Sequence, residues 1–354
     1  MAELVNVSDY ERAAEEKLGA GVFGYYAGGA GDEWTLRENV AAFNRWILRP
    51  RMLVDVGAVT TKTEVLGHEI SMPVLAAPTA FHRLAHPEGE LVAARAAASA
   101  GTVFCLSTLA CVTPAEVAEA APDGARWFQL YWSRDRGFTT DLLARAAEAG
   151  FSALLLTIDL PVLGRRERDV RTSFDLPPDL PFPNVAEAYR THTAHGPLNE
   201  IVDPTLTWKD LEWLAERTQL PLVLKGILTA EDATLACEHG AAGVVVSNHG
   251  GRQLDGVAAS LDALPEVVEA CGGDIAVLLD GGVRRGTDVV KALALGADAV
   301  LVGRPILWRL SAAGEEGIRA VLELFREEVA LALALLGCPA PGSVTREHVA
   351  RAVS

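Results

Sequence analysis

The sequence contains few cysteines, a shortage of basic residues and no long apolar run, and each shortage excludes a class of protein. Five cysteines among 354 residues, none of them in a CxxC pair, argue against a disulfide framework and against a thiolate zinc site. We therefore predict no metal, and we interpret the cysteines as reduced, mostly buried thiols of a cytoplasmic protein. No apolar run approaches the roughly 18–20 residues of a membrane span, and the N-terminal segment lacks a signal-peptide core.

The charge balance excludes a second class of partner. The chain has 31 basic and 47 acidic residues, a net charge of −16, whereas nucleic-acid binding needs basic residues that displace phosphate counterions. Half of the residues are hydrophobic and 22% are charged, which supplies ample material for a buried core. We expect a folded protein that acts on a small molecule, with no nucleic-acid or membrane partner.

Eight short apolar runs divide the chain. They lack polar alternation, which is typical of strands buried on both faces of a parallel sheet. Helical patterns separate several of them, as at residues 88–100, 139–149 and 230–239. This alternation predicts a (β/α)8 TIM barrel of the α/β class; a doubly wound open sheet is the alternative, but no GxGxxG turn follows the first run. The runs are residues 73–79, 102–107, 127–131, 153–159, 221–225, 243–248, 276–280 and 299–304.

Two segments fall outside the alternation. Residues 1–65 form a predicted N-terminal helical extension, in which Ser8-x-x-Glu11 has the pattern of a capping box that opens a helix. Residues 66–354 form the predicted barrel, and we treat residues 1–354 as a single domain. Residues 176–204, between the fourth and fifth strands, are rich in proline, which prevents regular helix. We interpret them as a mobile active-site loop, with a plain surface loop as the alternative.

Polar residues stand at the end of every one of the eight runs. In a barrel of this type the carboxyl ends of the strands form the functional face. One polar strand end is as often structural as functional, but a full ring is better explained by one polar ligand across the barrel mouth. The members are Thr79, Ser107, Gln129, Tyr131, Thr157, Asp159, Lys225, residues 247–252, Asp280, Gly303 and Arg304.

Turns that contain glycine and arginine follow the last two runs. Residues 280–286 (DGGVRRG) and 303–305 (GRP) occupy the loops where many barrels hold a phosphate. Because glycine lets backbone N–H groups approach an anion and Arg284 or Arg304 can neutralise it, we predict a phosphate site there. Lys225 ends another apolar run, and is either a Schiff-base former or a cation placed against an electron-accepting ring.

The segment 247–256 (SNHGGRQLDG) is the densest cluster of candidate residues. His249 can act as a base near neutral pH, and Arg252 has the fork geometry that matches a carboxylate. Arg166 follows Asp159 after a turn, and a carboxylate held near His249 would stabilise the imidazolium that forms when it takes a proton. Together with the phosphate site, these residues predict proton and hydride chemistry on a carboxylate substrate.

Several motifs, in order along the chain, resemble those of the FMN-dependent 2-hydroxy acid oxidase family. The resemblance covers nearly the whole chain and implies an FMN-binding barrel that oxidises an (S)-2-hydroxy acid to the 2-oxo acid. The motifs are YYAGGAGDEWTL, APTAFHRLAHPEGE, WFQLYWSRDR, TIDLPVLGRRERD, LKGILTAEDA, SNHGGRQLDG and DGGVRRGTDVVKALALGA.

The resemblance also implies roles for individual residues. His249 would take the hydroxyl proton, or the α-proton in a carbanion version of the reaction, with Asp159 as its partner. Lys225 would lie near N1 and O2 of the flavin, which favours the electrostatic interpretation over the Schiff base. The residues implied for the substrate are Tyr25, Tyr131, Arg166 and Arg252, the arginines holding its carboxylate. The other FMN contacts implied are Pro78, Thr79, Ala80, Ser107, Gln129, Thr157, Ser247, Asp280, Gly281, Gly282, Val283, Arg284, Gly303 and Arg304.

One position departs from the glycolate-oxidising members. Those members carry a tryptophan where this chain has Leu109, so Leu109 should widen the pocket above the flavin and belongs with the substrate-binding residues. The chain is more similar here to bacterial 4-hydroxymandelate oxidases, which favours an aromatic or medium-chain aliphatic substrate. The implied acceptor is O2, with H2O2 as product, in a cytoplasmic homo-oligomer, a tetramer or an octamer.

Three alternatives stay open. Within the family, the chain could be a lactate or glycolate oxidase, or a lactate 2-monooxygenase that decarboxylates the bound oxo acid before release. From another class, it could be an aldolase or isomerase that forms a Schiff base through Lys225. The last is a flavin-binding barrel without activity, and the presence of a base beside two arginines argues against it.

Overall fold

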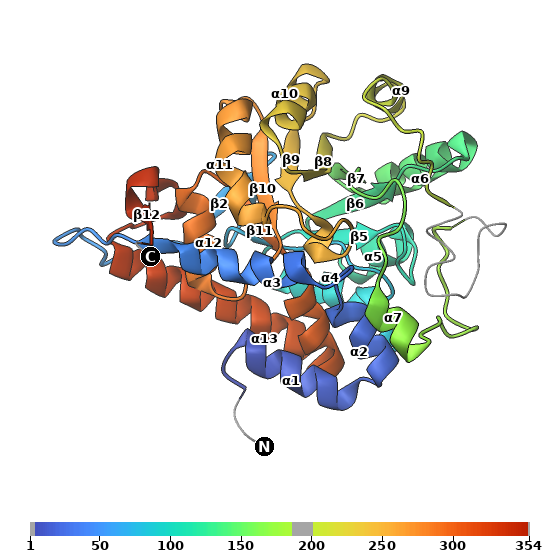
Figure 1. Ribbon diagram of the computed structural model, residues 1–354, viewed down its shortest axis with the longest axis horizontal. Helices are drawn as coiled ribbons and strands as arrows, with labels where there is room; N and C mark the ends of the chain where they lie inside the picture. The colour runs from blue at the N-terminus through green and yellow to red at the C-terminus, as the bar shows by residue number, and fades with distance from the viewer. Residues whose placement is uncertain (1–3, 186–200, 353–354) are drawn as a thin grey trace.

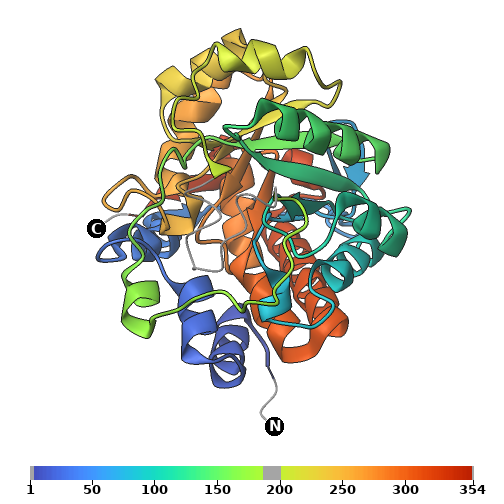
Figure 2. The ribbon, with the colours of Figure 1, turned by 90° about the vertical axis from the view of Figure 1, so that its right-hand side faces the viewer.

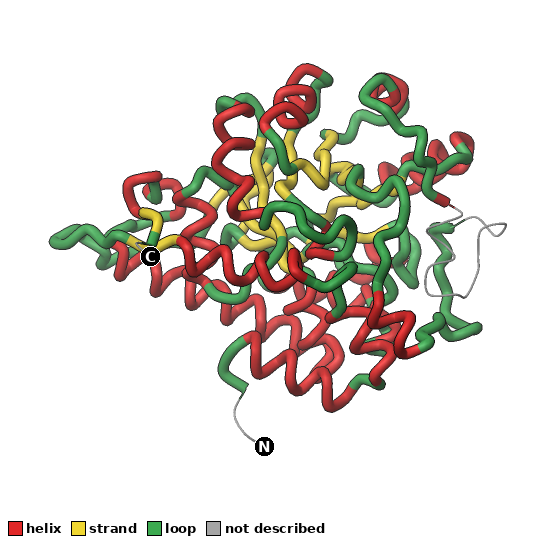
Figure 3. The backbone as a smooth tube through the Cα atoms, viewed as in Figure 1, coloured by secondary structure: helices red, strands yellow, loops and turns green. Residues whose placement is uncertain are grey.

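The computed structural model describes residues 4–185 and 201–352. Eight parallel strands close into a barrel at the centre of the molecule, and helices surround it (Figures 1 and 3). Each strand overlaps one of the eight predicted apolar runs. The predicted (β/α)8 barrel is therefore confirmed, and the doubly wound open sheet is excluded. The strands are β4 (Val74–Ala76), β5 (Phe104–Ser107), β6 (Arg126–Tyr131), β7 (Ala153–Thr157), β8 (Leu222–Ile227), β9 (Gly243–Val246), β10 (Ala276–Asp280) and β11 (Ala299–Val302).

Helices connect successive strands, and their ends follow local sequence signals. Helix α5 begins with a capping box, since the side chain of Thr113 accepts from the Glu116 N–H while Glu116 accepts from the Thr113 N–H. Helix α13 consists of two helices joined at a kink, where Gly314 has a φ of 57°. The outer helices are α4 (Glu90–Ser99), α5 (Pro114–Ala120), α6 (Arg136–Glu148), α9 (Asp210–Ala215), α10 (Ala230–Glu238), α11 (Ser260–Cys271), α12 (Gly286–Ala294) and α13 (Arg304–Leu336).

The barrel interior is apolar at the end where the strands begin. A compact cluster that includes Trp127, Val223 and Leu278 fills it, distinct from the larger cluster between strands and helices. The hairpin of β2 (Thr63–Val65) and β3 (His68–Ile70) adds one apolar side chain from each strand to this interior cluster. Because apolar packing closes this end, polar side chains collect at the opposite, carboxyl end of the strands, which we call the mouth.

The predicted N-terminal extension is helical and packs beside the barrel; Figure 2 shows α1 and α2 next to α13. One detail of the prediction is wrong: Asn6, not Ser8, is the N-cap of α1, and its side chain accepts from the Asp9 N–H at 2.9 Å. Asn6 has the extended backbone that a cap needs, whereas Ser8 is already helical. The elements are α1 (Val7–Lys17), α2 (Ala20–Ala27), α3 (Trp34–Ala41), η1 (Ala42–Arg45) and β1 (Trp46–Leu48), which pairs with β12 (Val349–Arg351).

The proline-rich loop lies partly within the described residues. Residues 176–185 pack onto the barrel, where Leu176, Phe182 and Val185 are buried. The segment 186–200 of the predicted loop lies outside the described residues, and the mobility of the loop stays a prediction. In the described part of the chain, no helix has both the length and the apolar character needed to cross a membrane.

A reciprocal amide pair fastens the extension to the mouth. Asn39 of α3 donates to Asn248 Oδ1 at 2.8 Å, and Asn248 Nδ2 donates back to Asn39 Oδ1 at 2.7 Å. Asn39 Oδ1 also accepts from the Ser260 N–H at 3.3 Å. Both asparagines are almost fully buried, so loss of either one leaves buried polar groups without partners.

We therefore expect Asn39→Ala to lower the free energy of unfolding by about 2 kcal/mol, because a buried donor or acceptor without a partner is costly. The urea midpoint of the holoprotein measures this. Asn44→Ala is the matched control, since Asn44 lies in the same extension but is exposed. Equal midpoints for the two variants would contradict the role assigned to the pair.

Candidate active site

The mouth of the barrel holds a cavity that opens to solvent. Strand ends form its floor, and the tyrosines of α2 form part of its wall. All of the site residues predicted from the sequence line this cavity except two, Asp159 and Ser247. These two lie directly behind the lining, where they hydrogen-bond to His249. The structure thus brings the whole predicted set to one place.

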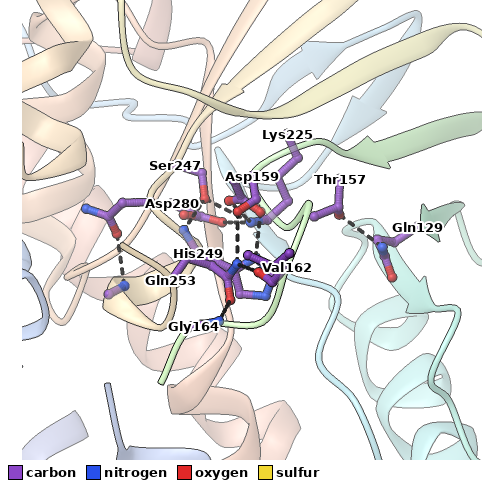
Figure 4. A network of polar contacts seen from close by, with 12 residues as sticks. Gln129, Thr157, Asp159, Val162, Gly164, Lys225, Ser247, His249, Gln253 and Asp280 are labelled. Carbon is purple, nitrogen blue, oxygen red and sulfur yellow. Dashed lines mark hydrogen bonds and ion pairs between the residues drawn. The ribbon is translucent and has the colours of Figure 1, made fainter. Parts of the chain in front are cut away.

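His249 and Asp159 form a hydrogen-bonded pair across two loops. Nδ1 of His249 lies 2.8 Å from Oδ1 of Asp159 (Figure 4), and the His249 N–H donates to Ser247 Oγ at 3.0 Å. Gly226 leaves room for this arrangement, because a Cβ there would lie 2.6 Å from Cβ of Asp159. With Nδ1 engaged by the carboxylate, Nε2 is the ring nitrogen left to exchange a proton.

The charge states of the pair suit a base and its partner. Burial lowers the pKa of His249 and outweighs Asp159, which acts in the opposite direction, so the imidazole is neutral near pH 7. Burial raises the pKa of Asp159, but the neighbouring His249 and Lys225 more than offset this, and the net pKa lies below the usual range. The pair is therefore a neutral imidazole held by a carboxylate.

Lys225 lies beneath this pair. Its Nζ is 3.1 Å from Asp280 Oδ2, 2.8 Å from Ser247 Oγ and 3.9 Å from Asp159 Oδ2. Burial lowers the pKa of Lys225, but Asp280 and Asp159 outweigh burial, so its pKa stays above the ordinary value. A Schiff base needs a neutral amine, and this lysine is held as a cation, which argues against the aldolase alternative.

Two arginines stand above the base. Arg166 is 4% exposed, and burial followed by the charge of Arg252 lowers its pKa to about 10. Arg252 donates to the backbone carbonyl oxygens of Tyr25 and Gly28 and stacks over the Tyr25 ring. Among the described residues neither guanidinium has an ion pair with a carboxylate, and Nε of Arg166 has no hydrogen-bond partner. An anionic substrate group would relieve their mutual repulsion.

The end of the cavity predicted to hold a phosphate also contains two arginines, Arg284 and Arg304, both partly buried. Burial lowers the pKa of Arg284, and burial together with Arg252 and Arg284 lowers that of Arg304 to about 9. Arg304 donates to carbonyl oxygens of Tyr26, Gly28 and Gly250 at 2.9–3.0 Å, so it also holds the extension over the mouth.

In the turn after β10, position 282 needs glycine for a reason that differs from the predicted contact with a phosphate. A Cβ at Gly282 would lie 1.9 Å from the carbonyl oxygen of Asn39, and its φ is 81°. Glycine is therefore required there by the close approach of the extension. The contact of this turn with a phosphate stays a prediction.

Some residues of the site were not found from the sequence. Tyr26, Ala77 and Leu307 line the cavity, and the Tyr26 hydroxyl donates to the Phe81 carbonyl at 2.6 Å. The sequence did indicate Tyr26, since it follows Tyr25, which was predicted to contact the substrate. His82, which lies 2.6 Å from the Thr79 hydroxyl through Nε2, had no such signal because the contact depends on the fold.

Comparison with known proteins identifies the family. The family model described as FMN-dependent dehydrogenase matches residues 14–351. The chain is 52% identical to an L-lactate oxidase of Nostoc sp., over 94% of both chains. It is 50% identical to a glycolate oxidase of Oryza sativa subsp. japonica, over 99% of this chain and 96% of the relative.

Solved structures agree with these relatives. A crystal structure of mandelate oxidase is 44% identical and superposes with a TM-score of 0.92 over 99% of each chain. The chain therefore belongs to the family of FMN-dependent 2-hydroxy acid oxidases. It is an enzyme, and its cofactor is FMN.

The residues of the cavity fit this cofactor. Two partly buried arginines lie at one end for a phosphate, and the lysine ammonium lies on the floor. One carboxylate oxygen each of Asp159 and Asp280 is buried and accepts no hydrogen bond within the described residues, which leaves acceptors available for a polar ligand.

We expect His249→Ala to retain FMN and to lower turnover by roughly 10²–10⁴-fold, because a positioned general base contributes about that much. Flavin absorbance and steady-state kinetics measure the two effects. His68→Ala is the control, as His68 lies on the hairpin at the opposite end of the barrel. Activity near that of the wild type in the His249 variant would refute the assigned base.

Proposed function

We propose that this enzyme oxidises an (S)-2-hydroxy acid to the 2-oxo acid and reduces O2 to H2O2. The observation that carries the proposal is the His249–Asp159 pair, with a 2.8 Å hydrogen bond, beneath two arginines that form no ion pair with a carboxylate among the described residues. FMN, when bound, accepts the two electrons removed from the substrate carbon. The protein's contribution is to bind the carboxylate, to orient the hydroxyl and to accept a proton.

Particular side chains can be assigned to each of these three tasks. Arg166 and Arg252 bind the carboxylate, and Nε2 of His249 takes the proton while Asp159 stabilises the imidazolium. Tyr25 and Tyr131 supply hydroxyl groups, and since burial raises the pKa of both, they remain protonated donors. These assignments are supported by the shared cavity that the five side chains other than Asp159 line.

We assign FMN binding to the remaining predicted residues. A chain of buried side chains supports the ring-binding part: Ser107 donates to Gln129 at 3.1 Å, and Gln129 donates to Thr157 at 3.0 Å. Lys225 and Ser247 complete it from the floor. The full set is Pro78, Thr79, Ala80, Ser107, Gln129, Thr157, Lys225, Ser247, Asp280, Gly281, Gly282, Val283, Arg284, Gly303 and Arg304.

Product analysis separates the proposed oxidase from a monooxygenase. We expect each O2 consumed to yield one 2-oxo acid and one H2O2, because the oxo acid leaves before it is decarboxylated. A monooxygenase would instead release CO2, water and a carboxylic acid one carbon shorter. An oxygen electrode combined with peroxide and oxo acid assays on the initial products decides the matter, and O2 consumption without release of H2O2 and oxo acid would contradict the proposal.

We further propose that the substrate is bulky, aromatic or of medium chain length. Leu109 lines the cavity and is 1% exposed, so it forms a wall of the substrate region. The likeness to mandelate oxidase, which has been solved with (S)-mandelic acid, supports an aromatic substrate. The similarity to lactate and glycolate oxidases supports the smaller alternatives.

We expect Leu109→Trp to lower kcat/KM for (S)-mandelate roughly 10- to 100-fold relative to that for glycolate, because a larger side chain occupies the volume of the substrate's ring. Leu254→Trp is the control, since Leu254 is exposed. An unchanged ratio of the two kcat/KM values would show that Leu109 does not select the substrate.

A homo-oligomer, a tetramer or an octamer, is also proposed. Exposed apolar side chains of Met52 and Leu53 lie in a segment held to the end of α13 by the Arg51 N–H, which donates to the Leu336 carbonyl. Leu331 and Leu335, on the same end of α13, are exposed as well. Apolar groups gathered in this way are typical of protein–protein contacts. Light scattering measures the number of subunits in the assembly.

A cytoplasmic location is also proposed, and the free cysteines support it.

A further inference from the structure

Two loops of the mouth each carry one half of the catalytic arrangement. The loop after β7 carries Asp159 and Arg166, and the loop after β9 carries His249 and Arg252. Strand β8 lies between their parent strands in the barrel. The distance between base and carboxylate, and that between the arginines, therefore depend on how the two loops are held against each other.

The side chain of Gln253 joins these loops. Its Nε2 donates to the carbonyl oxygens of Asp159 at 3.0 Å and of Val162 at 2.9 Å. Its Oε1 accepts from the Gly164 N–H at 3.1 Å. Both amide hydrogens and the amide oxygen are thus engaged with a single loop, as Figure 4 shows.

The backbones of the two loops are also in direct contact beside this amide. A Cβ on Gly164 would lie 2.5 Å from the Arg252 carbonyl oxygen and 2.7 Å from Cα of Gln253. Only glycine allows so close an approach without a shift of one loop. Gly164 and Gln253 together therefore fix the spacing of the loops, the first by close approach and the second by three hydrogen bonds.

We propose that Gln253 is a positioning residue for the proton transfer: it holds the loop of Asp159 in register with the loop of His249. Gln253 is not among the residues that line the described cavity, so it acts through this pair rather than on the substrate. The inference rests on the proposed role of His249 as base.

We call the three hydrogen bonds of the Gln253 side chain the clamp. Loss of the clamp should change the pH dependence of kcat/KM in a distinctive way. Burial lowers the pKa of His249 and Asp159 raises it, so a looser contact with Asp159 lowers the pKa further. Since the base must be unprotonated to act, the ascending limb of kcat/KM moves to lower pH. The charged groups that face His249 are Asp159 and Arg166 from the loop after β7, Lys225 from β8, Asp280 from β10 through Lys225, and Arg252 from its own loop.

The variant Gln253→Met tests the proposal, because methionine keeps the length of the side chain and removes all three hydrogen bonds. We expect kcat/KM to fall roughly 10- to 100-fold, with an apparent pKa below that of the wild type. FMN stays bound with an unchanged visible spectrum, since the clamp does not line the cavity. Gln219→Met, at an exposed glutamine, is the matched control and keeps the wild-type profile.

A second variant separates the loops without touching Gln253. Gly164→Ala places a Cβ against the Arg252 carbonyl, and we expect the same downward shift of the apparent pKa and a loss of kcat/KM of similar size. This variant carries the test if the methionine variant does not fold.

Two outcomes overturn the inference, and one is separate from it. A wild-type pH profile with kcat/KM within threefold of the wild type, in either folded variant, would overturn it. A lower kcat/KM with an unshifted profile would also overturn it, since that pattern indicates a purely structural role. If the wild-type enzyme itself oxidises no 2-hydroxy acid, the proposed function fails instead, whatever the variants do.

Discussion

The buried ammonium group of Lys225 links the carboxylates beneath the mouth and acts on the base that lies above it. It lies within 4 Å of two carboxylates, Asp159 and Asp280, and a buried cation is stable only beside such partners. Its charge helps to hold the pKa of Asp159 low and adds to the lowering of the pKa of His249. Burial keeps the imidazole neutral, with a smaller contribution from Lys225, and the carboxylate stays ionised. These are the states that proton abstraction requires. The lysine remains protonated in this arrangement, and for that reason a Schiff-base mechanism does not suit the site.

The N-terminal extension is part of the site rather than an addition to it. Its backbone carbonyl groups accept from Arg252 and Arg304, and its tyrosines line the cavity. The amide pair of Asn39 and Asn248 and the close approach at Gly282 fasten it to the loops of the barrel. The cavity therefore exists only when the extension is folded against the mouth. The carbonyl groups and tyrosines of the extension thus shield the arginines of the cavity in part from solvent, although these arginines lie at the open end of a barrel.

The sequence was sufficient to predict the barrel, because buried parallel strands leave unbroken apolar runs and polar strand ends mark the mouth. It also predicted most of the residues that line the cavity. What it could not supply were contacts between residues distant in the chain. The partners of Arg304 and the clamp of Gln253 depend on how loops meet, and Gly282 is explained by Asn39, about 240 residues earlier. The N-cap was misplaced by two residues because both Asn6 and Ser8 have capping side chains and only the backbone distinguishes them.

We propose that the mouth brings a base, a carboxylate-binding pair of arginines and FMN together for oxidation of a 2-hydroxy acid. Anaerobic mixing of the holoprotein with glycolate, L-lactate, (S)-mandelate and 2-hydroxyoctanoate tests it most directly, with the flavin absorbance as the signal. We expect rapid bleaching by at least one of these acids, fastest with (S)-mandelate or 2-hydroxyoctanoate, and recovery of the absorbance when O2 is admitted. Bound flavin that none of the four acids bleaches would contradict it.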